Sequence, residues 1–164
     1  MARPPRLLVV HHTVSPATEA MLEAVRSGTR AEGIAGVEIV VRAALSATAA
    51  DVLAAGAVVL GTPANLGYIS GALKHFFDTV YYTVREETRG LPYAAYLHAT
   101  EGPEGALRAL ASITTGLGWV RARPDVVVSG MPTPTDLEAC WELAATLALG
   151  VVGDTPAGDP GAAG

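Results

Sequence analysis

The chain has 164 residues, of which half are hydrophobic and only 16% are charged, and its formal net charge is −5 at pH 7. This length corresponds to one ordinary domain with a substantial core, and the composition excludes a disordered or highly charged chain. The negative charge disfavours nucleic acid as a partner, because binding to a phosphate backbone requires a basic face.

Membrane and export signals are not expected from the apolar runs. Runs such as Leu7 to Val10 are far shorter than the roughly 20 residues that cross a bilayer. The same run is too short for a signal peptide and is closed by His11 and His12. The single cysteine, Cys140, cannot form an internal disulfide, which agrees with a reducing compartment. These observations predict a cytoplasmic protein without a membrane segment.

Short apolar, β-branched runs alternate with alanine- and leucine-rich stretches, which is the pattern of stacked βαβ units. In chain order the sequence predicts strands and helices at Arg6–His11 (strand), Pro16–Glu32 (helix), Val37–Val41 (strand), Ala49–Ala55 (helix), Ala57–Gly61 (strand), Ser70–Arg85 (helix), Tyr93–His98 (strand), Glu104–Thr115 (helix), Asp125–Val128 (strand) and Thr135–Leu149 (helix). Nearly continuous apolar strands are typical of a parallel sheet with helices on both faces. The predicted fold is therefore α/β, a doubly wound three-layer sandwich with a five-stranded parallel sheet.

One domain is expected over residues 1–153. The remaining segment, residues 154–164, contains only Gly, Pro, Ala, Thr and Asp. Such a composition cannot bury enough apolar surface to offset the entropy lost on ordering. We expect this segment to be a disordered C-terminal tail.

The loop after the first predicted strand has the composition of an anion site. Thr13, Ser15 and Thr18 place three hydroxyls around the start of a helix, and Pro16 occupies a first-turn position where its missing N–H costs nothing. Free backbone N–H groups and the helix dipole favour an anion there. The alternative interpretation is that Ser15 is simply a helix cap.

The loop after the third predicted strand carries a family resemblance. The stretch contains Gly61-Thr62-Pro63, then Gly67, then Ser70-Gly71-Ala72-Leu73-Lys74, and it ends in Phe76-Phe77-Asp78. It resembles the corresponding segment of flavodoxin-like NAD(P)H-dependent FMN oxidoreductases and quinone reductases. The resemblance covers the chain up to about Leu149 and implies a flavodoxin-like fold with strand order 2-1-3-4-5 and FMN as the cofactor.

The same resemblance implies which residues contact FMN. Three loops contribute them: the first holds the phosphate, the second edges the isoalloxazine ring and the third meets its pyrimidine edge. The residues are Thr13, Ser15, Ala17, Thr18, Pro63, Ala64, Asn65, Leu66, Gly67, His98, Ala99, Thr100, Gly102 and Gly105. No catalytic side chain is expected, because the cofactor carries the chemistry.

Three positions depart from the family pattern. Pro16 stands where many relatives have glycine, which removes one backbone donor from the phosphate loop. Relatives often have an aromatic residue at Asn65 or Leu66, so ring stacking on the flavin is lost here. Glu101 brings a negative charge toward the pyrimidine end of the flavin, where it would oppose the anionic reduced form if it points inward.

The function implied by the resemblance is electron transfer from NAD(P)H through FMN to a quinone, a flavin or a similar small-molecule acceptor. Two alternatives stay open: an electron-carrying flavodoxin without hydride chemistry, and a flavin-free domain that uses the cleft for binding or regulation. A homodimer is also expected, through the aromatic-rich helix Ser70–Arg85 and its continuation toward Glu87 and Arg89.

Several conspicuous residues have structural interpretations. His11 and His12 are neighbours in a strand and face opposite sides, so no metal site is expected. Cys140 and Trp141 lie near Leu137 and Ala144 on the closing helix, and both are predicted to face the core.

Overall fold

The computed structural model describes residues 3–153, so the predicted tail over 154–164 lies outside the described residues. Within the described range the elements are β1 (Arg6–His11), α1 (Pro16–Gly28), β2 (Glu38–Ala43), α2 (Ala49–Leu53), β3 (Ala57–Asn65), β4 (Tyr68–Ile69), α3 (Gly71–Val84), β5 (Pro92–Ala99), α4 (Glu104–Leu117), β6 (Val120–Arg121), β7 (Val126–Ser129) and α5 (Pro134–Gly153). None of these helices is long and apolar enough to cross a membrane.

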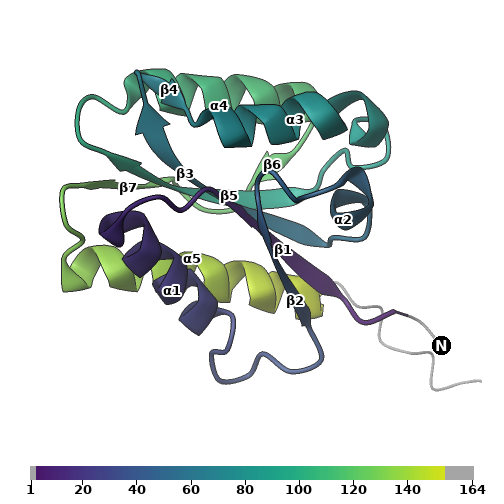
Figure 1. Cartoon of the computed structure of the whole chain (residues 1–164). Helices are drawn as coiled ribbons and strands as arrows, with labels where there is room; N and C mark the ends of the chain where they lie inside the picture. Colours follow the sequence, from purple (N-terminus) through teal and green to yellow (C-terminus); the bar gives the residue numbers. More distant parts are fainter. Residues whose placement is uncertain (1–2, 154–164) are drawn as a thin grey trace, which may run out of the picture.

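A central parallel sheet lies between two layers of helices, with α3 and α4 on one face and α1 and α5 on the other (Figure 1). The main path of the sheet runs β2-β1-β3-β5, and β6 and β7 both pair with β5. Leu8 of β1 pairs with Val40 of β2 on one side and with Val58 of β3 on the other. The predicted three-layer α/β sandwich and the order 2-1-3-4-5 are confirmed.

The predicted fifth strand, Asp125–Val128, corresponds to β7, and the structure adds an unpredicted short strand, β6, at the same edge of the sheet. β6 pairs with the start of β5 through Val120, whereas β7 pairs with the end of β5, from Tyr96 to Ala99. Pro124 lies in the gap between β6 and β7 and has no N–H to donate to a strand ladder. The edge position is therefore filled by two short segments.

The third strand is longer than predicted and continues into a β-hairpin. Ala64 pairs with Ile69, and Asn65 pairs with Tyr68, in an antiparallel ladder between β3 and β4. The two residues of the turn, Leu66 and Gly67, have φ values of 51° and 72°. Two-residue hairpin turns often require positive φ at both positions, which glycine adopts freely and leucine does not. The segment that was expected to be an irregular loop is thus largely a strand and a tight turn.

The core is divided by the sheet into two clusters. Alternate strand residues such as Leu8 and Leu7 point to opposite faces, the first toward α3 and α4 and the second toward α1 and α5. Phe76 and Phe77 of α3 are both buried in the first cluster. The two phenylalanines in the middle of this helix therefore belong to the core.

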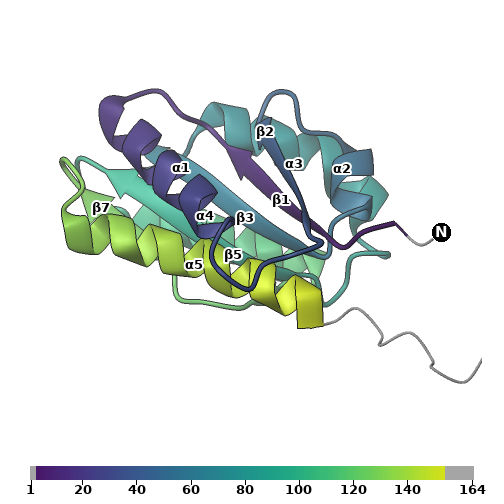
Figure 2. The same ribbon diagram turned by 90° about the horizontal axis from the view of Figure 1, so that it is seen from below.

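Helices α1 and α5 lie side by side beneath the sheet (Figure 2). A Cβ atom added at Gly28 of α1 would clash with the backbone carbonyl of Trp141 in α5, so glycine permits this close approach. Cys140 is fully buried as predicted, but Trp141 is 37% exposed. The prediction of a core-facing Trp141 was wrong, because successive residues on a helix are about 100° apart and only one of the pair can face the sheet.

Candidate functional site

The carboxyl ends of β1, β3 and β5 meet at one edge of the sheet, because the three strands are parallel neighbours. The loop after β1 is attached directly to β3, since the His12 N–H donates a hydrogen bond of 2.9 Å to the Gly61 carbonyl. In open α/β sheets, ligands bind outside the carboxyl ends of the strands. All three loops that were singled out in the sequence therefore lie at the expected edge.

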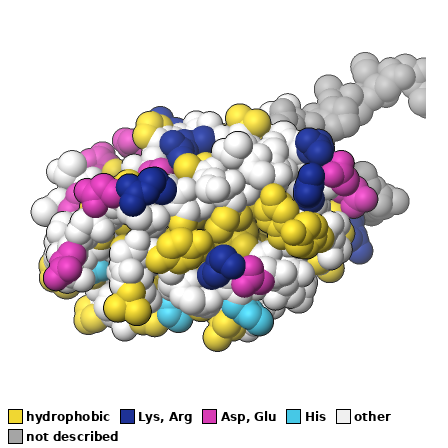
Figure 3. Space-filling model, turned by 90° about the horizontal axis from the view of Figure 1, so that it is seen from above, with side chains coloured by type: hydrophobic (Ala, Val, Ile, Leu, Met, Phe, Trp, Pro, Cys, Tyr) yellow, Lys and Arg dark blue, Asp and Glu magenta, His cyan; other side chains and the backbone are white. Residues whose placement is uncertain are grey.

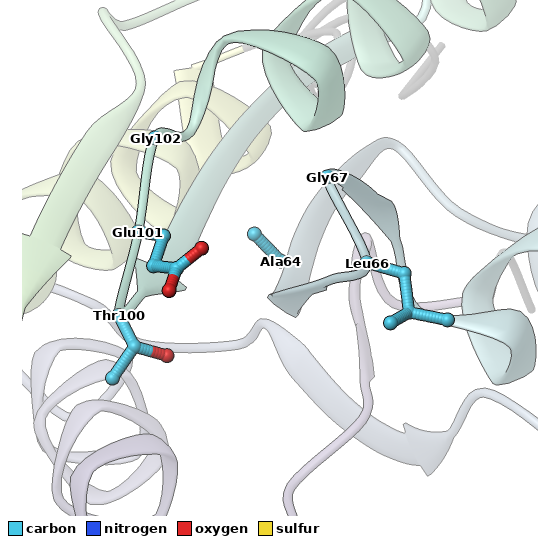
Figure 4. A pocket seen from close by; sticks show the side chains of 6 residues that line it. All are labelled: Ala64, Leu66, Gly67, Thr100, Glu101 and Gly102. Atoms are coloured by element: carbon cyan, nitrogen blue, oxygen red, sulfur yellow. The ribbon is translucent and has the colours of Figure 1, made fainter.

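A pocket of about 330 Å³ lies between the loops that follow β3 and β5. Its lining comes from both loops and consists of Ala64, Leu66, Gly67, Thr100, Glu101 and Gly102. Figure 4 shows the Glu101 carboxylate directed across the pocket toward Ala64, while the Leu66 side chain points away from it. Five of the six lining residues were predicted as cofactor contacts, and the sixth, Glu101, was noted for its charge.

The loop before α1 is organised around the hydroxyl of Thr18. This hydroxyl accepts hydrogen bonds from the Val14 and Ser15 N–H groups at 3.1 and 3.0 Å, and it is 2% exposed. Ser15 is the N-cap, and its hydroxyl in turn accepts from the Thr18 N–H at 3.2 Å. Ser15 and Thr18 thus form a capping box, which fixes the direction of the helix start.

The remaining donors of this loop suit an anion. Pro16 occupies the first turn, and the N–H of Ala17 has no acceptor within its own helix, as for every first-turn amide. The Ala17 side chain is buried, so only its backbone can contribute. Thr13 shares a hydrogen bond of 2.8 Å with Nδ1 of His11.

The charge state of His11 bears on this anion site. Burial, and then the charges of Arg26 and His12, lower the pKa of His11 below its usual value of 6.5. A lowered pKa leaves the imidazole neutral at pH 7. An anion at this loop would therefore be held by amides, hydroxyls and the helix dipole, because the segment from Thr13 to Thr18 contains no Lys or Arg.

Two hydroxyls that were not predicted as functional hold the second loop in place. The Thr62 hydroxyl is buried, donates to the Pro63 carbonyl at 2.8 Å and accepts from the Ser70 N–H at 3.1 Å. The Ser70 hydroxyl caps α3 by accepting from the Leu73 N–H at 3.2 Å. The Thr62-Pro63 and Ser70-Gly71 pairs of the motif therefore fix the two ends of the hairpin. The spacing of these two pairs in the sequence is the pattern that could have indicated this role.

The start of α4 is packed against the tip of the hairpin. A Cβ atom added at Gly105 would overlap the carbonyl oxygen of Gly67. Glycine at position 105 thus lets the helix touch the turn, and this contact joins the second and third loops across the pocket. Gly105 was predicted as a cofactor contact. In the structure, the side of Gly105 where a Cβ atom would stand faces the Gly67 carbonyl oxygen.

The other predicted residues surround the pocket without lining it. Pro63 and Ala99 are buried at the strand ends, and Asn65 is exposed on the hairpin. The Nε2 atom of His98 lies 2.8 Å from the Gly130 carbonyl, which ties β5 to the loop after β7. Across the described residues, no group of three or more His, Cys, Asp or Glu side chains could hold a metal ion.

Comparison with protein families decides what kind of site this is. The family model described as NADPH-dependent FMN reductase matches residues 32–130, which is more than half of the chain. The chain belongs to the NADPH-dependent FMN reductase family. FMN is accordingly the cofactor of this chain, as the sequence resemblance predicted.

Individual relatives of this FMN reductase family member include flavodoxins. A protein named flavodoxin from Aquifex aeolicus (strain VF5) is 36% identical over 75 residues, which is 46% of this chain and 40% of that protein. The chain therefore matches less than half the length of this relative.

Solved structures show the same fold. A flavodoxin from the domain Archaea has a TM-score of 0.76 at 22% identity and covers 90% of this chain and 99% of its own. A flavodoxin, WrbA-like protein from Agrobacterium tumefaciens has a TM-score of 0.72 at 19% identity, covering 91% and 98%. Rubredoxin oxygen:oxidoreductase from Desulfovibrio gigas has a TM-score of 0.76 at 20% identity and covers 94% of this chain but 38% of its own.

The residues of this family member fit FMN. Thr13, Ser15 and the N–H of Ala17 offer hydroxyl and amide donors of the kind that a phosphate group requires, whereas the Thr18 and Glu19 N–H groups already donate to Ser15. The adjacent pocket is lined largely by small residues such as Ala64 and Gly102, so a planar ring can approach the backbone on both sides. The loop before α1 and the pocket after β3 are neighbours because β1 pairs with β3.

Proposed function

We propose that this chain passes electrons from NADH or NADPH through FMN to a quinone, a free flavin or a similar small acceptor. The observation that carries the proposal is the pocket between the loops after β3 and β5, which lies beside a helix start suited to phosphate. When bound, FMN supplies the hydride chemistry, and the protein supplies position, shielding and electrostatics.

The roles of the chain's own residues follow from their places. The free N–H of Ala17 with Thr13 and Ser15 bind the phosphate end, and the buried Thr18 hydroxyl holds this loop in place. Ala64, Gly67 and Gly102 shape the ring pocket through their backbone, and Leu66 lies at its rim, fully exposed. Because the Leu66 side chain is aliphatic and points away from the pocket, it leaves the ring open to a second ligand such as a nicotinamide.

Anaerobic reduction tests this function. FMN-loaded protein should lose its visible absorption on addition of NADH or NADPH, and a quinone added afterwards should restore the oxidised spectrum. A comparison of the two nucleotides also gives the preference between them. Reduction by dithionite but by neither nucleotide would contradict the proposal.

An electron-carrying flavodoxin is the second candidate. It is supported by the similarity to the archaeal flavodoxin. The match covers 99% of that flavodoxin chain, so that protein has no extra domain. Such carriers are usually strongly acidic for docking to partners, and the net charge of −5 is small for this role. Dithionite-only reduction in the experiment above is the result that would favour this candidate.

A homodimer through α3 is part of the proposal. Figure 3 looks onto the layer of α3 and α4 and shows hydrophobic side chains gathered on this face. Tyr82 of α3 is 83% exposed, and its ring packs edge-on against Tyr81 at a centroid distance of 5.2 Å. Exposed aromatic side chains are typical of interfaces.

Sedimentation velocity at tens of micromolar protein should therefore show a dimer, and Tyr82→Asp should shift it to a monomer. A wild-type monomer under these conditions would contradict the dimer.

A cytoplasmic location belongs to the same proposal and is supported by Cys140, a buried free thiol that suits a reducing compartment.

A further inference from the structure

Glu101 is the only charged residue among the six that line the pocket. It follows β5 directly, and its carboxylate points into the pocket, toward Ala64 on the opposite loop (Figure 4). The described lining contains no Lys, Arg or His that could neutralise it. Two further charged groups lie just behind the lining: a Glu104 carboxylate oxygen beside Gly102, and an Arg108 guanidinium nitrogen 3.9 Å from the Cβ position of Gly105. Among the lining side chains themselves, Glu101 alone presents a charge to a ligand.

The phosphate loop does not offset this charge. The segment from Thr13 to Thr18 contains no Lys or Arg. The pKa of His11 is lowered by burial and by neighbouring cations, so its imidazole adds no positive charge at pH 7. The Glu101 carboxylate is thus the charge that the lining directs into the pocket, and it acts most strongly at short range because Coulomb interactions weaken with distance and with solvent screening.

The two redox states of FMN respond differently to such a field. The isoalloxazine ring is neutral when oxidised, whereas the fully reduced ring at neutral pH carries a negative charge in its pyrimidine half. A nearby carboxylate therefore raises the free energy of the bound reduced form and leaves the oxidised form nearly unchanged.

We propose that Glu101 tunes the redox state of the cofactor by weakening the binding of reduced FMN relative to oxidised FMN. The inference rests on the proposed function and goes beyond it, because it assigns to one side chain the lowering of the reduction potential of bound FMN. By linkage, a tenfold weaker binding of the reduced form lowers the two-electron potential by about 30 mV. Bound FMN then becomes a stronger electron donor, and the reduced flavin leaves the site more readily.

The test compares the affinities of both redox states in wild type, Glu101→Gln and Glu87→Gln. Gln keeps the size of the side chain and removes its charge. Glu87 is a matched control, because it follows α3 and lies at the opposite edge of the sheet from the pocket. Oxidised FMN is titrated by fluorescence quenching, and reduced FMN is titrated anaerobically by calorimetry.

We expect Glu101→Gln to bind reduced FMN about tenfold more tightly than wild type, with oxidised FMN changed by less than about threefold. The measured midpoint potential should rise accordingly, and 1 M salt should reduce the difference between the two proteins. Glu87→Gln should match wild type in both affinities.

Two failures are distinguishable. An unchanged ratio of the two affinities in Glu101→Gln would overturn this inference and leave the proposed function intact. A wild-type protein that binds neither redox state at micromolar concentration would overturn the proposed function, and the inference with it.

Discussion

Thr18→Ala is expected to weaken FMN binding by about tenfold or more, while riboflavin binding changes little. The Thr18 hydroxyl accepts hydrogen bonds from the N–H groups of Val14 and Ser15 and so fixes the loop that is proposed to hold the phosphate. Alanine leaves both amides without this acceptor and loosens the loop. Riboflavin lacks the phosphate, so its binding depends only on the ring pocket.

Thr18→Ser is the matched control, because it keeps the hydroxyl and loses only a methyl group. It should bind FMN nearly as wild type does. The Thr18 hydroxyl is buried, so thermal melts of the apoproteins are needed to measure the loss of stability, about 1–3 kcal/mol for unsatisfied buried partners. Equal weakening of FMN and riboflavin in Thr18→Ala would show that the phosphate binds elsewhere.

Gly61→Ala is expected to destabilise the fold by about 1–3 kcal/mol or more, as for other overpacked cores. The Cβ atom would overlap the Cζ, Cε1 and hydroxyl oxygen atoms of Tyr96, which packs against the Gly61 backbone from the neighbouring strand. Both residues are buried in the sheet, so neither backbone can move aside easily. Denaturant unfolding monitored by circular dichroism measures the change.

Two further variants separate overpacking from a general intolerance of alanine. Gly71→Ala, at the first position of α3, meets no atom within 4 Å and should leave stability unchanged or raise it slightly. In a Tyr96→Ala background the added methyl group has room, so Gly61→Ala should cost much less there. Equal costs in the two backgrounds would contradict the assigned clash.

Tyr96→Phe adds information on the same cluster. Among the described residues, the Tyr96 hydroxyl is buried and has no hydrogen-bond partner. Burial also raises the pKa of this phenol far above its usual value, so the group stays neutral. Its removal should therefore be neutral or stabilising, in contrast to Gly61→Ala.

Features encoded by local pattern were predicted from the sequence. Apolar runs such as Leu7 to Val10 identified the buried strands, since a parallel sheet is covered on both faces. Ser15 with Pro16 marked the start of α1, because capping preferences depend on only a few neighbouring residues. The strand order followed from the family resemblance, and the structure confirmed it.

Features that depend on distant partners or on unusual dihedral angles were not predicted. The β3–β4 hairpin requires a positive φ at Leu66, which leucine disfavours. The local sequence pattern therefore did not indicate a hairpin. The contact between Gly105 and Gly67 arises only when two loops far apart in the chain meet. The break in the fifth strand reflects Pro124 and was missed because a single strand was expected there.

The broken outer strand also affects how the molecule behaves in a crowded solution. A long, regular sheet edge can serve as a template for strand pairing with another chain, and this is a route to aggregation. On this side of the sheet, β6 and β7 offer only short ladders on either side of a proline. On the other side, β2 carries the exposed charges of Glu38 and Arg42. Neither edge is suited to being extended by a second copy, which agrees with the proposal that a dimer would form through a helical face.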